Sequence, residues 1–462
     1  MKQSAVSLDR SRRDFLRQGV TASALMLAPS PLFAAIEWPR APQQIEGRPW
    51  LAAALKAERW LAASAQPVRD GVTWPADPTD PKSVSTDLYT GMAGVVLFYL
   101  ELHNATGDEA ALRMARGGAD YLLASVPDEA VNTEMGLYSG LAGTATVLAL
   151  AYRVSQDGRY LAGVKRILGL IAHAARPTGN GVEWNQSTDI ISGSAGIGLA
   201  LLSLAELSRD VDARKLASDA GSRLIERAQV VDDGLTWLVQ PDMPRNYPNF
   251  SHGTAGVSHF LATLSRSSKK HEHLDGALAG ERWLRARMTT TTNGGRMVYH
   301  SSPGNEQIFY LSWCHGPTGT ARLYRSLAQV TGDRSWDARV DQLAQAVRDM
   351  KVPGRSPGFW NNISQCCGNC GVSEFFIAMH RRSHDARHLE FAEEIGHDTL
   401  ARATADGDGF KWVQAEHRVR PELLVAQTGL MQGAAGVGLA MLHLDGAREG
   451  RTPLVRLPDD PF

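Results

Sequence analysis

Residues 192–202 read SGSAGIGLALL, and this short pattern decides the fold of the chain. Two glycines lie three residues apart, the residue before the second glycine is alanine, and an apolar run follows. The run is apolar on all sides, which is typical of a helix that is buried all round. One Gly-x-x-Gly has little meaning by itself, so its recurrence is what matters.

The pattern occurs seven times, with first glycines separated by 49 to 65 residues. The other copies are TGMAGVVLFYL (90–100), SGLAGTATVLAL (139–150), HGTAGVSHFLATL (252–264), HGPTGTARLYRSL (315–327), CGNCGVSEFFIAM (367–379) and QGAAGVGLAML (432–442). Repetition at a nearly regular period indicates a repeat architecture, in which each unit buries its apolar face against its neighbours.

An amphipathic segment precedes each apolar run. In GRYLAGVKRILGLIAHAA (158–175), for example, apolar residues fall at i, i+3, i+4 and i+7. Seven helices of each kind can bury their faces by closing a double ring, with the apolar helices inside. We therefore expect an all-α fold, an α/α toroid of seven inner and seven outer helices, and a linear helical solenoid is the alternative. Short β-like insertions are expected at 234–249, 289–302 and 407–424.

In such a ring the glycines lie at the N-termini of the inner helices. Glycine there permits turns with positive φ and lets the backbone approach the centre closely. All seven turns then face the same end of the ring, so the side chains beside the glycines converge on one pocket. Thr90, Ser139 and Gln432 are beside glycines but carry no obvious chemistry.

Charge and composition exclude several classes of function. The 48 Lys and Arg against 49 Asp and Glu give a net charge of −1, so nothing indicates binding to nucleic acid or to an anionic membrane. The sequence contains no P-loop and no dinucleotide fingerprint, and we expect neither a nucleotide nor a redox cofactor. After the first 35 residues we expect no membrane span.

The N-terminal stretch SRRDFLRQGVTASALMLAPSPLFAA (11–35) places Arg12 and Arg13 before a weakly apolar run. It resembles a twin-arginine export signal, and a basic amphipathic helix is the alternative. We expect residues 1–35 to be this signal peptide and 36–462 to be one domain. The twin-arginine machinery would export the folded domain to the periplasm or the cell exterior. We expect the protein to be a monomer.

All four cysteines of the chain lie in two of the turns, WCHGPTG (313–319) and QCCGNCG (365–371). A disulfide between the adjacent Cys366 and Cys367 would be strained. Neighbouring turns of a ring lie side by side, so Cys314 can meet this pair at metal-ligand distance. Three thiolates with an open fourth position are typical of a zinc site that admits a substrate, although buried or disulfide-bonded cysteines remain an alternative.

The seven turns, together with WCHGPTG and QCCGNCG, resemble the lanthionine synthetase C-like family over essentially the whole chain after the signal. This resemblance implies a double α-barrel around a zinc ion, with Cys314 and Cys366 as ligands. Cys367 occupies the position where most members have a histidine ligand. The resemblance also implies catalytic roles for His252, as an acid, and for Asp189, as its partner in proton handling. From the residues alone, both could instead be structural, His252 as a turn residue and Asp189 as a helix-start cap or loop residue.

The family resemblance implies zinc-dependent thiol activation. A substrate thiolate adds to the β-carbon of a dehydroalanine or dehydrobutyrine, and the product is a thioether of the lanthionine type. Cyclisation of a peptide normally precedes its export. If this enzyme is itself exported, other functions must also be considered. These are addition of a small thiol such as glutathione to an unsaturated acceptor, a non-catalytic periplasmic barrel that binds zinc or peptide, and a glycoside-processing toroid.

Overall fold

The computed structural model describes residues 47–462 except 233, 244, 269, 298–308, 355–361 and 419. The expected signal peptide, residues 1–35, lies outside the described residues. Seven helices that each begin directly after the first glycine of a repeat form the inner wall. They are α3 (Met92–Thr106), α5 (Leu141–Ser155), α7 (Ser194–Ser208), α9 (Thr254–Ser265), α11 (Pro317–Thr331), α13 (Asn369–Ser383) and α15 (Ala434–Arg448).

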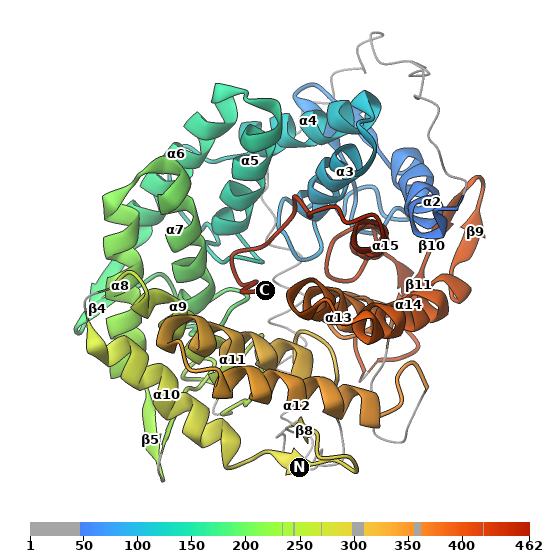
Figure 1. Cartoon of the computed structure of the whole chain (residues 1–462). Helices are drawn as coiled ribbons and strands as arrows, with labels where there is room; N and C mark the ends of the chain where they lie inside the picture. Colours follow the sequence, from blue (N-terminus) through green and yellow to red (C-terminus); the bar gives the residue numbers. More distant parts are fainter. Residues whose placement is uncertain are drawn as a thin grey trace.

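Seven amphipathic helices among the described residues form the outer wall. They are α2 (Pro49–Ala63), α4 (Glu109–Ala124), α6 (Gly158–Ala174), α8 (Val211–Glu226), α10 (His271–Arg285), α12 (Ser335–Asp349) and α14 (Ala386–Ala401). Figure 1 shows the two walls as a double ring, in which α15 packs against both α3 and α2. The first and last helices therefore meet, which confirms the toroid and rules out the linear solenoid.

Six two-stranded antiparallel hairpins decorate the described part of the ring. They are β1 (Gln66–Val68) with β2 (Gly71–Thr73), β3 (Arg176–Thr178) with β4 (Gly181–Glu183), β5 (Gln229–Val231) with β6 (Gly234–Thr236), β7 (Thr289–Thr290) with β8 (Arg296–Met297), β9 (Thr404–Asp406) with β10 (Gly409–Lys411), and β11 (Val413–Ala415) with β12 (Leu424–Ala426). The three expected insertions each contain strands, whereas β1–β2 and β3–β4 were not expected.

Four hairpins are fastened to the preceding outer helix by a buried tryptophan. In each case the indole N–H donates to a main-chain carbonyl thirteen residues earlier, in the last turns of that helix, at 2.7–2.9 Å. The tryptophans are Trp74, Trp184, Trp237 and Trp412. A buried indole needs such an acceptor, and here the acceptor is a carbonyl near the C-terminal end of the helix, where the regular main-chain hydrogen bonds run out.

The glycines of the seven turns are required by space rather than by φ. The first glycines have φ between −85° and −156°, so the expectation of positive φ was wrong. At the second glycine of six turns, a Cβ would lie 1.8–2.2 Å from the carbonyl oxygen six residues earlier. The turn folds back onto its own helix so closely that no side chain fits, which confirms the close approach.

A closed belt of main-chain hydrogen bonds joins the seven turns. The residue two positions before each first glycine takes part: Tyr89, Tyr138, Ile191, Ser251, Cys314, Cys366 and Met431. The N–H of one turn donates to the carbonyl of the next at 2.9–3.1 Å, and the seventh turn donates back across the closure, from Met431 N–H to the Tyr89 carbonyl. The third turn uses two residues for its two bonds. The carbonyl of Ile191 accepts from the N–H of Tyr138, and the N–H of Ile190 donates to the carbonyl of Ser251.

Three inner helices near the closure are joined by a buried ionic cluster. His443 of α15 lies with Nδ1 2.8 Å from a carboxylate oxygen of Glu374 of α13, and with Nε2 3.7 Å from Glu101 of α3. Although burial disfavours the protonated ring, the carboxylates of Glu374 and Glu101 raise the pKa of His443 from 6.5 to about 9. Although burial also disfavours the carboxylate, the interaction with the nearby His443 ring lowers the pKa of Glu101 to about 2. Among the described helices, none is long and apolar enough to cross a membrane.

This cluster makes the stability of the fold depend on pH. Because the pKa of His443 is higher in the folded chain, its contribution is full below about pH 6.5 and is lost as the pH rises through 9. Glu101 contributes above about pH 4.5 and loses its contribution as the pH falls through 2. We expect His443→Gln to cost on the order of 2–3 kcal/mol at pH 6 and much less at pH 10, because one pKa unit corresponds to about 1.4 kcal/mol. Urea unfolding at both pH values measures this, and an equal cost at both would contradict it.

The turn glycines provide a second test. In Gly196→Ala the new Cβ would lie 2.0 Å from the Ile190 carbonyl oxygen. We expect this variant to lose about 1–3 kcal/mol of unfolding free energy, the usual cost of overpacking. Gly169→Ala is the control, because it lies in an outer helix with nothing within 4 Å of the new Cβ. This control should gain up to about 1 kcal/mol of helix propensity. Equal stability of the two variants would contradict the steric role.

Candidate metal centre

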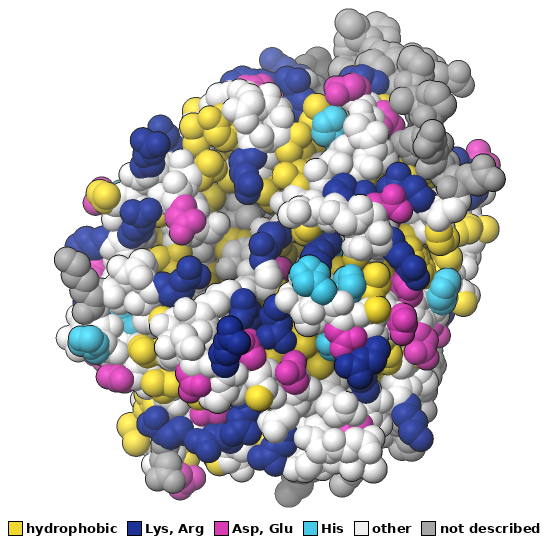
Figure 2. Space-filling view, viewed as in Figure 1, with side chains coloured by type: hydrophobic (Ala, Val, Ile, Leu, Met, Phe, Trp, Pro, Cys, Tyr) yellow, Lys and Arg dark blue, Asp and Glu magenta, His cyan; other side chains and the backbone are white. Residues whose placement is uncertain are grey.

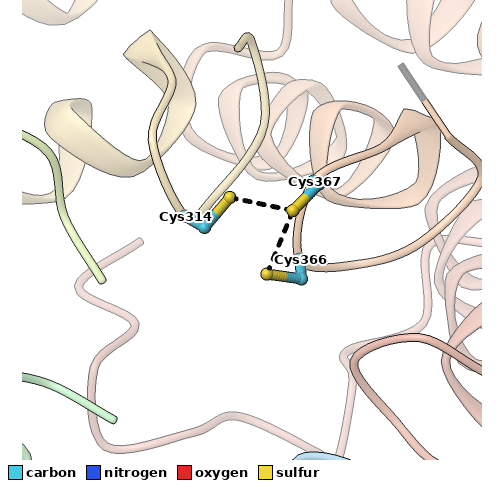
Figure 3. A group of neighbouring side chains, drawn as sticks. All are labelled: Cys314, Cys366 and Cys367. Atoms are coloured by element: carbon cyan, nitrogen blue, oxygen red, sulfur yellow. Dashed lines mark hydrogen bonds between the residues drawn. The ribbon is translucent and has the colours of Figure 1, made fainter. Parts of the chain in front are cut away.

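The fifth and sixth turns bring three cysteine sulfurs together. Cys314 comes from the turn before α11, and Cys366 with Cys367 from the turn before α13. The Cys367 sulfur lies 3.2 Å from that of Cys314 and 3.5 Å from that of Cys366 (Figure 3). The belt sets this spacing directly, since the N–H of Cys314 donates to the carbonyl of Cys366 at 3.0 Å. The cysteines are unpaired, so they form a cluster of thiols and not a disulfide.

The three thiols of the cluster influence one another's ionisation. Burial alone would raise the pKa of Cys366, yet hydrogen bonds from Cys314, Cys367 and Tyr89 lower it well below its usual range. The pKa of Cys314 is instead raised, by burial and by its hydrogen bonds with the other two sulfurs. One sulfur can therefore be a thiolate, whereas three neighbouring thiolates require a positive charge among them.

A metal ion fits this donor set. The three sulfurs all lie within 4.8 Å of one another. A tetrahedral zinc ion holds thiolate sulfurs at about 2.3 Å, which places two of them about 3.8 Å apart. Only small side-chain movements separate the thiol cluster from that geometry. Three soft donors leave one of four tetrahedral positions for a further ligand.

Tyr89 is part of the cluster, although sequence reasoning did not single it out. Its hydroxyl donates to the Cys366 sulfur at 3.0 Å and accepts from the Gln432 side-chain amide at 3.0 Å. Gln432 therefore does support the site, contrary to the expectation that it carries no chemistry. The signal was present in the repeat, since Tyr89 occupies in its own turn the position that Cys314 and Cys366 occupy in theirs.

Asp189 and His252 come from neighbouring turns and form a pair. Nδ1 of His252 lies 2.6 Å from Oδ2 of Asp189. The other carboxylate oxygen accepts the main-chain N–H of Ser192 at 2.9 Å and that of Gly193 at 2.7 Å. Asp189 is thus a turn residue and a partner of the imidazole at once. The Asp189 side chain is 2% exposed and the His252 side chain 29%, so the imidazole is the accessible member of the pair.

Two further residues of the cysteine turns, His315 and Cys370, do not belong to the group of three sulfurs. The ring of His315 lies 4.9 Å from that of Tyr310 and 6.1 Å from that of His252, so it lies near the His252–Asp189 pair. Cys370 is 1% exposed in the first turn of α13 and does not belong to the group of three sulfurs. Burial raises the pKa of its thiol, as expected of a small buried side chain.

Comparison with known proteins identifies the family and supports the fold. The family model described as lanthionine synthetase C-like protein matches residues 82–455, which include all seven turns. The chain belongs to the lanthionine synthetase C-like family. Among solved structures, nisin cyclase superposes with a TM-score of 0.59 over 80% of this chain and 90% of its own, at 16% identity, which supports the shared fold.

A curated zebrafish (Danio rerio) relative, glutathione S-transferase LANCL1, is 21% identical over 319 residues, covering 65% of this chain and 71% of the relative. An α-1,6-mannanase from Salegentibacter also superposes, with a TM-score of 0.45 at 12% identity over 87% of this chain and 99% of its own. That score is too low to carry an argument about function.

Replacing single cysteines tests the metal centre. We expect Cys366→Ala to lower the affinity for zinc by at least about 100-fold, more than the loss of a hydrogen-bond partner of a ligand costs. Cys370→Ala is the matched control, because it removes a buried thiol four residues away that does not belong to the cluster. Chelator competition gives the affinity and elemental analysis gives the occupancy. One equivalent of tightly bound zinc in Cys366→Ala would contradict the assignment.

Proposed function

We propose that this member of the lanthionine synthetase C-like family is a zinc-dependent enzyme that forms carbon–sulfur bonds. It would add a thiol of a peptide substrate to a dehydroalanine or dehydrobutyrine in the same peptide. The observation that carries this proposal is the juxtaposition of three sulfurs with the His252–Asp189 pair on neighbouring turns of one ring.

Cys314, Cys366 and Cys367 are the proposed zinc ligands. Zinc bound by them would leave one position open and would lower the pKa of a thiol that enters it. Cys367 adds a negative charge where most family members have a neutral histidine, so a substrate sulfur keeps more of its own electron density. The hydroxyl of Tyr89, which donates to Cys366, offsets part of that charge.

His252 is the proposed proton carrier and Asp189 orients it. Asp189 accepts from Nδ1, which fixes the tautomer of the neutral ring and leaves Nε2 to exchange protons. Nε2 takes the proton of the substrate thiol and holds it while the sulfur forms a bond to the β-carbon. The π electrons of the acceptor move to the enolate, and Nε2 returns the proton to the α-carbon. Atoms and charge balance without any oxidant or leaving group.

A second candidate is addition of a free thiol, such as glutathione, to an unsaturated acceptor. The observation that favours it is the zebrafish relative named as a glutathione S-transferase. Both candidates use the same residues in the same roles. They differ in whether the thiol and the acceptor belong to one molecule, and substrate arms of one experiment can separate them.

The test compares two peptides. One carries a dehydroalanine and a cysteine, and its cyclisation removes the free thiol without a change of mass. The other carries only the dehydroalanine and is supplied with glutathione, whose addition raises the mass. We expect the zinc-loaded protein to accelerate the first reaction above the rate without protein. Acceleration of the second reaction alone would instead favour the free-thiol candidate.

His252→Gln should slow the accelerated reaction by about 100-fold to 10,000-fold, the usual contribution of a positioned acid–base group, and should leave the zinc content unchanged. His271→Gln, an exposed histidine at the start of α10, is the matched control and should keep full activity. A zinc-loaded protein that accelerates neither reaction would contradict the proposal and favour a non-catalytic binding barrel.

A further inference from the structure

The chain after α15 turns back into the middle of the ring. The N–H groups of Leu454 and Val455 both donate to the Glu101 carboxylate of α3, at 2.8 Å each. Figure 1 places the end of the chain inside the double ring, and Figure 2 shows Lys and Arg side chains around the middle of this face. Residues 451–462, which we call the internal segment, therefore fill space enclosed by the inner helices.

The internal segment reaches the belt through one carboxylate. Oδ2 of Asp459 accepts from the indole Nε1 of Trp313 at 2.9 Å. Oδ1 accepts from the hydroxyl of Tyr138 at 3.1 Å. Trp313 directly precedes Cys314 in the fifth turn, and Tyr138 lies in the second turn. One side chain thus connects two turns that are not neighbours in the ring, and one of them carries a cysteine of the metal centre.

Asp459 is 1% exposed, so its charge needs compensation. Arg322 of α11 is a nearby positive charge: its guanidinium donates to the main-chain carbonyl of Asp459 at 3.2 Å and forms an ion pair with the Asp460 carboxylate at 3.1 Å. Although burial opposes the charge of Arg322, the carboxylates of Asp460 and Asp459 raise its pKa. A buried, compensated carboxylate adds little stability over an apolar residue, but it holds its partners in one orientation.

Trp313, which donates to the Asp459 carboxylate, is also packed between aromatic rings. The Trp313 ring lies 5.0 Å from the ring of Tyr138 and 5.7 Å from that of Phe250. Its N–H then has one acceptor, Asp459, which sets the position of the whole indole. Cys314 follows in the chain, and its sulfur is the single contribution of the fifth turn to a cluster whose other two sulfurs come from the sixth.

We propose that Asp459 is a positioning residue of the metal centre. Through Trp313 it fixes the fifth turn, and with it the Cys314 sulfur, at the distance from Cys366 and Cys367 that a metal requires. The internal segment then holds the fifth turn of the site in position from inside the ring. This inference rests on the proposed function, since it assumes that the three sulfurs bind zinc.

The test measures zinc affinity and the absorption of the cobalt(II)-substituted protein, which reports sulfur–metal geometry. Asp459→Leu keeps the approximate shape but removes the acceptor. We expect it to lower zinc affinity by about 10-fold to 100-fold, as loss of an outer partner of a metal ligand does, and to shift the sulfur-to-cobalt charge-transfer band. Asp459→Asn retains an oxygen for Trp313 and should restore most of the affinity.

Tyr138→Phe is the matched control, because it removes the other hydrogen bond of the same carboxylate and leaves the bond to Trp313. It should lower the thermal stability with no change in zinc affinity or cobalt spectrum. If Asp459→Leu does not fold, Trp313→Phe removes the donor of the same hydrogen bond and should weaken zinc binding in the same way.

Two results would overturn the inference, and they are distinguishable. Unchanged zinc affinity and cobalt spectrum in folded Asp459→Leu, or in Trp313→Phe, would overturn it while leaving the proposed function intact. Equal loss of affinity in Tyr138→Phe would reduce Asp459 to a general stabilising role and would also overturn it. A wild-type protein that binds neither zinc nor cobalt would overturn the proposed function, and this inference with it.

Discussion

The belt of main-chain hydrogen bonds is the constraint on which the rest of the structure depends. It joins each turn to the next and closes between Met431 and Tyr89. Because the bonds are made by the backbone two residues before each first glycine, they require tight turns there. The second glycine makes the turn tight, since its missing Cβ leaves room for a carbonyl oxygen. The double ring of helices then follows, because each inner helix starts from a turn whose position is already set.

The candidate metal centre uses this geometry with few additional residues. Two of its sulfurs, those of Cys314 and Cys366, belong to residues of the belt itself, and their backbones are hydrogen-bonded to each other. The thiols would otherwise be three buried weak acids whose ionisation is mutually unfavourable. Close approach imposed by the backbone therefore brings together three donors that could hold a cation. Tyr89 joins the same site from the first turn, which meets the seventh turn where the ring closes.

The repeat predicted the ring and the meeting of the three cysteines, because both depend on period and on the adjacency of turns. Other features were beyond that reasoning. Periodicity shows where a glycine falls but not whether φ or steric space demands it. Strands of three residues, such as β1 and β3, are too short to show alternation. The contact between Tyr89 and Cys366 spans 277 residues and exists only because the ring closes. Asp459 lies outside every repeat, so no pattern pointed to it.

The position two residues before each first glycine has one further consequence. Its hydrogen bonds come from the backbone, so its side chain is free to vary, and the chain indeed places tyrosine, isoleucine, serine, cysteine and methionine there. Seven positions with similar main-chain hydrogen bonding thus lie along one belt, and two of them hold cysteine. A metal-binding side chain at Ile191 or Met431 would leave the main-chain hydrogen bonds of the belt in place. The side chains at these positions can therefore change one at a time while the fold is retained.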